Sequence, residues 1–146
     1  MILSAEQLFS DDQAVTATAV STNVIDLGVP GTPYGAVAPL NQDVGKGAPV
    51  PVLIQVTEDF ATLTSLTITL EVDSTADLAT APVVVDTQTI AVADLLAGKQ
   101  TFMQYLPNGL DKRYMGVRYT VTGSAATAGQ ITAGISMGNQ TNVTGA

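Results

Sequence analysis

The feature that most constrains this chain is the alternation of apolar and polar side chains along several short segments. From Leu66 to Val72 every second residue is apolar, and threonine or glutamate lies between. The same period runs through residues 117–122 and 131–137. Successive side chains of a β-strand point to opposite faces, so this period predicts half-buried strands.

Weaker patterns predict further strands, because they are rich in the β-branched residues that suit a pleated surface. These weaker segments are residues 14–21, 24–27, 50–56, 83–89 and 100–106. Helix signals are few. Ser4–Gln7 has the spacing of a capping box, and residues 92–97, followed by Gly98, allow one more helical turn.

Glycine and small residues fill the segment 123–129, between the last two predicted strands. This composition predicts a hairpin connection, so we expect those two strands to pair antiparallel. Together the patterns predict an all-β fold. We expect a single antiparallel sandwich or barrel of seven or eight short strands with little helix, and a jelly roll is one of several topologies that fit.

The chain length fits one domain, residues 1–146, with two distinctive segments. Residues 28–47 contain three prolines and five glycines, which predicts a long irregular loop of the kind that often contacts a partner. Residues 1–13 are expected to form an N-terminal arm. Its apolar side chains lie outside any clear strand and are candidate contacts between chains: Ile2, Leu3, Leu8 and Phe9.

Charge and missing residue types exclude several classes of function. The net charge of −8 argues against a nucleic-acid partner. Cysteine and histidine are absent, which excludes disulfides, a thiolate nucleophile and histidine-ligated zinc. The aspartates at 11–12 and 73–77 lack EF-hand spacing and fit turns better than calcium sites. Nothing pairs Asp73 with Asp86 as a glycosidase would require, so we expect neither an enzyme nor a cofactor.

Hydropathy suggests that other proteins cover much of the surface. Charged residues are only 12% of the chain, yet no apolar run approaches the roughly 20 residues of a membrane span. The first residues lack the basic and apolar regions of a secretory signal, so we expect the protein to stay in the cytosol where it is made. Large neutral areas on such a protein are typical of an assembly component.

Five sequence segments together are similar to a known family. They are residues 9–15, 21–28, 107–114, 117–123 and 128–134. In these segments the chain resembles the capsid cement, or decoration, proteins of short-tailed bacteriophages. The resemblance covers residues 1–28 and roughly 98–135, whereas residues 30–41 look like a loop extension. The shared motifs are structural and carry no chemistry.

The resemblance implies an antiparallel, jelly-roll-like β-sandwich that serves as a structural virion protein on the outer capsid surface and is made in the host bacterial cytoplasm. Such a protein clamps neighbouring subunits of the major capsid protein against internal DNA pressure. It implies a homo-oligomer, with a homodimer favoured and a homotrimer possible, and no membrane or nucleic-acid partner. The alternative is a glycan- or receptor-binding β-module, which the lack of tryptophan makes less favourable. An exposed aromatic patch would favour that alternative, whereas flat Thr/Ala/Val faces and buried termini would favour a cement protein.

Positive charge and tyrosine gather at the entry to the strand that starts near residue 117. The candidate interface residues here are Lys112, Arg113, Tyr114 and Arg118. Arginine can bind a carboxylate of a partner through two hydrogen bonds, although a cationic turn is equally often only solvated. Tyr105 is a further candidate, while Tyr119 alternates with core positions and is expected inside.

Overall fold

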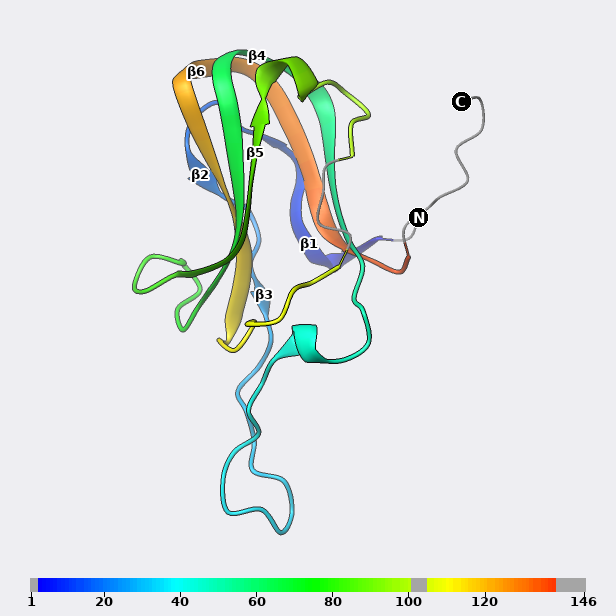
Figure 1. The fold of residues 1–146 in the computed structure, drawn as a ribbon, viewed down its shortest axis with the longest axis vertical. Helices are drawn as coiled ribbons and strands as arrows, with labels where there is room; N and C mark the ends of the chain where they lie inside the picture. Colours follow the sequence, from blue (N-terminus) through cyan, green and yellow to red (C-terminus); the bar gives the residue numbers. More distant parts are fainter. Residues whose placement is uncertain (1–2, 101–104, 139–146) are drawn as a thin grey trace.

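The structure is a computed structural model that describes residues 3–100 and 105–138. In chain order the strands are β1 (Leu3–Ala14), β2 (Ala19–Val20), β3 (Ile25–Asp26), β4 (Val52–Asp73), β5 (Val83–Ala91) and β6 (Tyr114–Ser136). Two short 3₁₀ helices, η1 (Val44–Lys46) and η2 (Val92–Asp94), complete the regular structure. Every pair of these strands is antiparallel, so the predicted all-β class is confirmed (Figure 1).

The two longest strands, β4 and β6, organise the whole fold. They pair from Val52 opposite Ile135 to Asp73 opposite Tyr114. Between Val56 and Ser65 the register shifts repeatedly, and here both strands bend over (Figure 1). β-Bulges sharpen the local twist and bend a strand, so these shifts fold one continuous sheet back on itself.

The fold-back creates two layers. The first layer contains β1, the second half of β6 and the first half of β4. The second layer contains β2, β3, the first half of β6, the second half of β4, and β5. Isolated bridges from Gln100 to Gln55 and from Tyr105 to Pro51 extend the first layer past β4.

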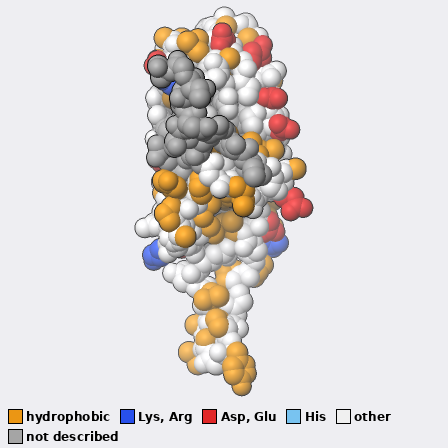
Figure 2. All heavy atoms as spheres, turned by 90° about the vertical axis from the view of Figure 1, so that its right-hand side faces the viewer, with side chains coloured by type: hydrophobic (Ala, Val, Ile, Leu, Met, Phe, Trp, Pro, Cys, Tyr) orange, Lys and Arg blue, Asp and Glu red, His pale blue; other side chains and the backbone are white. Residues whose placement is uncertain are grey.

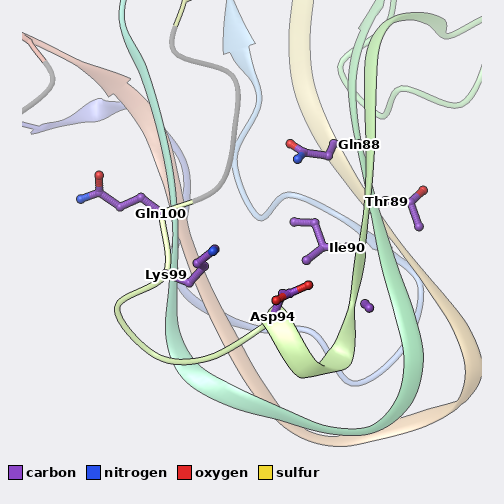
Figure 3. Close-up of a pocket in the computed structure, with 7 residues that line it drawn as sticks. Gln88, Thr89, Ile90, Asp94, Lys99 and Gln100 are labelled. Atoms are coloured by element: carbon purple, nitrogen blue, oxygen red, sulfur yellow. The ribbon is translucent and has the colours of Figure 1, made fainter.

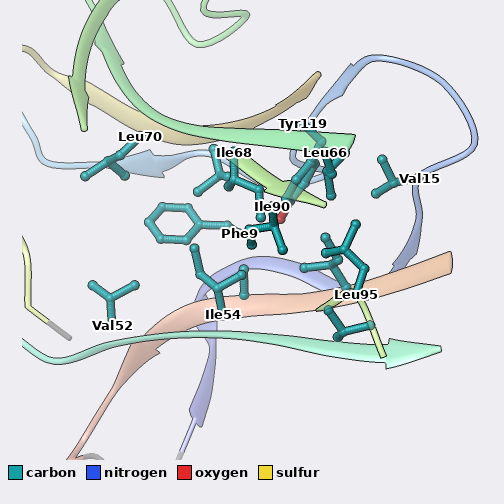
Figure 4. Packing of buried hydrophobic residues seen from close by; sticks show 14 of the residues in the cluster. Phe9, Val15, Val52, Ile54, Leu66, Ile68, Leu70, Ile90, Leu95 and Tyr119 are labelled. Atoms are coloured by element: carbon teal, nitrogen blue, oxygen red, sulfur yellow. The ribbon is translucent and has the colours of Figure 1, made fainter. Parts of the chain in front are cut away.

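The core lies between the two layers (Figure 4). Phe9 and Ile54 come from the first layer, and Leu66 and Ile68 come from the second. All four side chains are at most 1% exposed. Burying one such side chain contributes on the order of 1.5–3 kcal/mol, as an upper estimate. The alternation of apolar and polar residues in the sequence therefore predicts correctly which side chains of β4 point into the core.

Tyr119 lies in this core, as predicted, with its hydroxyl 2.8 Å from the Oγ atom of Ser10. Burial raises the pKa of the Tyr119 hydroxyl well above its ordinary value, although the hydrogen bond with Ser10 opposes the shift. The phenol is therefore neutral, and its hydroxyl is hydrogen-bonded to Ser10 of the other layer.

Several predicted elements merge in the structure. The segments 50–56 and 66–72 both belong to β4, and the segments 117–122 and 131–136 both belong to β6. The predicted hairpin at 123–129 is wrong, because these residues lie inside β6 and cross the bend. Each half of β6 pairs with β4 rather than with the other half.

The predicted N-terminal elements are also wrong in part. Ser4–Gln7 is not a helical turn, because it lies in β1 and this strand pairs with β6. The turn predicted at 92–97 is confirmed as η2, and Gly98 has a φ of 86° shortly after it. Residues 101–104 of the strand predicted at 100–106 lie outside the described residues. Within residues 3–100 and 105–138, no helix has the length and hydropathy of a transmembrane segment.

Candidate interaction surfaces

Arg113 makes its ion pair within the chain. Its Nε and Nη2 atoms donate to the two carboxylate oxygens of Asp26, at 2.9 and 2.8 Å. The guanidinium also lies 4.9 Å from the centre of the Tyr114 ring. The hydrogen bond from Arg113 holds the pKa of Asp26 below its usual range. This contact fastens the start of β6 to β3.

Arg118 is also paired within the chain. Its Nε donates to both oxygens of Glu71, at 3.0 and 2.9 Å, and its Nη2 donates to the carbonyl of Leu78 at 2.8 Å. The Glu71 side chain is only 5% exposed. Arg118 therefore fastens the loop after β4 to the sheet. The cations do not form one free cluster, and an interface role for Lys112 and Tyr114 stays a prediction.

The predicted N-terminal arm is a strand of the sheet. Leu3 pairs with Ser136 and Leu8 with Gly134, and both leucine side chains are partly buried. Phe9 is fully buried in the core, so its side chain is not available to another chain. Ile2 lies outside the described residues. Residues 3–13 hold the fold together, which corrects their prediction as an arm.

Small hydroxyl side chains lie side by side on the outer face of the second layer. Register places Thr67 between Thr89 and Thr120, and the Thr67 and Thr89 Oγ1 atoms are 2.8 Å apart. We call this surface the threonine face; its members are Ser65, Thr67, Thr69, Thr87, Thr89, Thr120 and Thr122. The Arg118–Glu71 ion pair adjoins it.

The threonine face contains no charged member, although the chain carries a net charge of −8. Threonine hydroxyls donate and accept hydrogen bonds, and the β-branched side chain loses little rotational freedom when it is covered. Such a face suits a flat contact with another protein. The polar half of the alternation from 66 to 72, which is Thr67, Thr69 and Glu71, is the sequence signal for this surface.

A long loop between β3 and η1 projects from the body of the molecule (Figure 1). Every residue from Val29 to Asn41 is exposed, and residues 28–42, which we call the projecting loop, contain no charged side chain. Four large apolar side chains on it are at least 61% exposed: Val29, Tyr34, Val37 and Leu40. Figure 2 shows apolar side chains along the loop, while acidic side chains gather on the body.

Backbone contacts give the projecting loop a defined shape. A turn is closed by the Ala36 amide, which donates to the Pro33 carbonyl at 3.0 Å, and Gly35 within it has a φ of 83°. Further along, the Leu40 amide donates to the carbonyl of Gly31 at 3.0 Å. Glycine with a positive φ at the third position of a turn is typical of type II, and Tyr34 occupies the second position of this turn.

Asp43 anchors the base of this loop. Its carboxylate accepts hydrogen bonds from the backbone amides of Gly109, Leu110 and Gly45, at 3.1–3.2 Å. The amide of Gly109, followed by those of Leu110 and Gly45, holds the pKa of Asp43 below its usual range against the opposing effect of burial. The loop base is thereby fixed to the segment before β6.

A recess of about 350 Å³ opens between β5 and the segment that follows η2 (Figure 3). Its lining residues are Gln88, Thr89, Ile90, Ala91, Asp94, Lys99 and Gln100. The Oε1 atom of Gln88 is buried and has no hydrogen-bond partner among the described residues. The lining is mainly polar and carries both signs of charge, but it contains no recognisable catalytic arrangement.

Asp73 has a structural explanation. Its carboxylate accepts from the amides of Ser74, Thr80 and Ala81, at 2.6–3.1 Å, and so closes the loop after β4. Burial raises the pKa of Asp73, but the amides of Ala81 and Ser74 outweigh that effect and the net shift is downward. Over residues 3–100 and 105–138, no three acidic side chains are grouped as metal ligands.

One family model, Bbp16, matches residues 9–135. The chain belongs to the Bbp16 family. The matched range of this family includes the bend in β4 and β6, the threonine face and the projecting loop. No curated protein matches the chain.

Proposed function

We propose that the protein is a capsid cement, or decoration, protein of a bacteriophage. In this role it is a structural virion protein without enzymatic activity or cofactor. It binds the outer surface of the head and clamps neighbouring major capsid subunits against the pressure of packaged DNA. The name of the Bbp16 family, which points to phages, supports this role, as do the motifs that resemble cement proteins.

The threonine face is the observation that carries the proposal. A regular antiparallel ladder holds its members side by side, and these members are small and uncharged. A protein that must cover a large area of another protein benefits from such a surface, since few flexible or charged side chains need to be ordered or desolvated. The carboxylate of Glu71, which adjoins this face at Thr69, is paired with Arg118.

We further propose that the protein acts as a homo-oligomer, with a dimer favoured over a trimer. A symmetric oligomer engages several capsid subunits at once, so each additional contact raises the effective concentration for the next. This multivalency gives retention on the head without requiring a tight single contact.

The proposal is tested by co-sedimentation of the purified protein with expanded heads that lack it. We expect saturable binding at a simple ratio to the major capsid protein and a higher temperature of DNA release. Thr120→Arg, beside Thr67 on the threonine face, should weaken binding about tenfold or more because it buries an unpaired charge. Thr57→Arg, an exposed position at the bend, is the matched control.

Absence of binding by the wild-type protein would contradict the proposed function. A glycan screen would then examine the alternative, a receptor-binding module. If Thr120→Arg and Thr57→Arg weaken binding equally, the threonine face is not part of the contact with the head. The wild-type protein would still be a head-binding protein.

A further inference from the structure

The geometry points to the projecting loop, residues 28–42, as a preformed peg that inserts Tyr34 into an apolar pocket of the major capsid protein. This inference rests on the proposed function and names the part of the chain that makes the central contact. It is independent of the threonine face, which lies on the second layer of the sandwich.

The shape of the loop is the first argument. Its turn at Pro33–Ala36 and the bond from Leu40 to Gly31 fix the backbone, and Gln42 Nε2 donates to the Leu27 carbonyl at 2.7 Å near the base. Asp43 then ties the base to the body. A segment already held in shape loses less conformational entropy on binding, so more of its contact energy appears as affinity.

The chemistry of the loop is the second argument. Tyr34 and Val37 are fully exposed, and Val29 and Leu40 remain more than half exposed. Tyrosine is enriched among the few interface residues that supply most of the binding energy, particularly where it fills a pocket that excludes water. Since the loop contains no charge, a partner pocket needs aliphatic walls, no charged group and one acceptor or donor for the phenol.

The choice of partner is the third argument. Within residues 3–100 and 105–138, a second copy of this chain offers a recess lined by Asp94, Lys99 and two glutamines, which does not suit an uncharged apolar tip. The pocket is therefore assigned to the capsid subunit, which the proposed function already places in contact.

The experiment measures half-saturation of expanded heads by full-length Tyr34→Ala, Tyr34→Asp and Tyr34→Phe variants. We expect Tyr34→Ala to weaken binding roughly 30-fold, the factor that corresponds to an interface hot spot. Tyr34→Asp should weaken it at least as much, because a carboxylate would enter an apolar pocket. Tyr34→Phe retains the ring and should stay within about fivefold of the wild type, since it loses one hydrogen bond.

Thr57→Asp is the matched control, because it adds the same charge at an exposed position of the bend. Circular dichroism and size-exclusion chromatography establish that each variant keeps its fold and oligomeric state. If Tyr34→Asp binds heads as tightly as the wild type does, the loop inference is overturned and the proposed function stays intact. A change of oligomeric state in Tyr34→Asp assigns the loop to a second copy and also overturns it. If the wild type does not bind heads, the proposed function fails and this inference falls with it.

Discussion

Arg118 and Glu71 form an ion pair across two adjacent strands, with 2.9 Å between Nε and Oε2. The carboxylate side is almost completely covered, at 5% exposure, while the arginine side chain is 28% exposed. Thr69 adds a hydrogen bond from its hydroxyl to the same carboxylate, at 2.9 Å. The pair joins β4 to β6 and, through the carbonyl of Leu78, holds the loop after β4.

We predict that Arg118→Met destabilises the protein by about 3 kcal/mol, because it leaves the charge of Glu71 covered and without its partner. Chemical denaturation at neutral pH measures this loss. Replacing both members, as Glu71→Leu with Arg118→Met, should restore most of the stability, since a well-packed apolar pair avoids the desolvation of both charges. A single variant as stable as the wild type would show that the ion pair contributes nothing.

Phe9 gives a second prediction, because it comes from the segment that the sequence suggested as a free arm. Phe9→Ala should reduce the free energy of unfolding by about 3–5 kcal/mol, through lost burial and the cavity that remains. Ala5→Ser on the same strand, at an exposed position, is the control and should change little. Deletion of residues 1–9 should likewise unfold the domain, so loss of head binding by that deletion would not identify a contact with the capsid.

Gly129 lies at the bend of β6 with a φ of 134°. A Cβ atom there would overlap with the ring of Phe60. Gly129→Ala should therefore cost about 2–4 kcal/mol, from backbone strain together with overpacking. Gly31→Ala in the projecting loop is the matched control, because a Cβ atom there would meet nothing within 4 Å. Similar thermal midpoints for the two variants would contradict the role assigned to the bend.

Acid should destabilise the protein through three carboxyl groups. Asp26, Asp43 and Asp73 all have a pKa below the ordinary value of 3.8 in the folded chain. A carboxyl group with a lower pKa in the folded state contributes stability that is fully present well above its unfolded pKa. That contribution is lost as the pH falls through the folded value. We expect a constant free energy of unfolding from neutral pH to about pH 5, and a decline below about pH 4.

Asp43→Asn should make this decline shallower, because one of the three groups no longer titrates. Asp11→Asn, an exposed carboxylate on β1, is the control for the loss of one negative charge. Unfolding curves for both variants across the acidic range give the comparison. If the free energy of unfolding declines equally with acid in Asp43→Asn and in the wild type, Asp43 does not contribute to the acid dependence.

The parts of the fold that could be predicted are those that local patterns of apolar and polar residues determine. The alternation from Leu66 to Val72 identified the inner face of β4, since those four apolar side chains are all buried. The composition of 123–129 was misleading because glycines suit a hairpin and a bend equally well. Gly123 and Gly129 do have positive φ angles, but the chain continues in the same strand. Only the long-range pairing with β4 distinguishes the two.

The same reason explains the errors at the candidate site. Arg113 finds its partner 87 residues away in Asp26, and Arg118 finds Glu71 47 residues away. No local pattern links residues at such separations, so a cationic cluster was expected where the fold has two ion pairs. The capping-box spacing at Ser4–Gln7 was overridden for the same reason, because β6 supplies strand partners for β1.

The pairing of Leu3 with Ser136 determines when this protein can fold during its synthesis. Translation proceeds from the N-terminus, so β1 emerges first but waits for the last residues of β6. β4 can pair with β5 as soon as β5 has been made, but the longer pairing of β4 with β6 also waits for the end of β6. Native contacts so distant in sequence fold slowly, on a scale of milliseconds to seconds. The nascent chain therefore remains open until the whole of β6 has been made, and the two layers close only then.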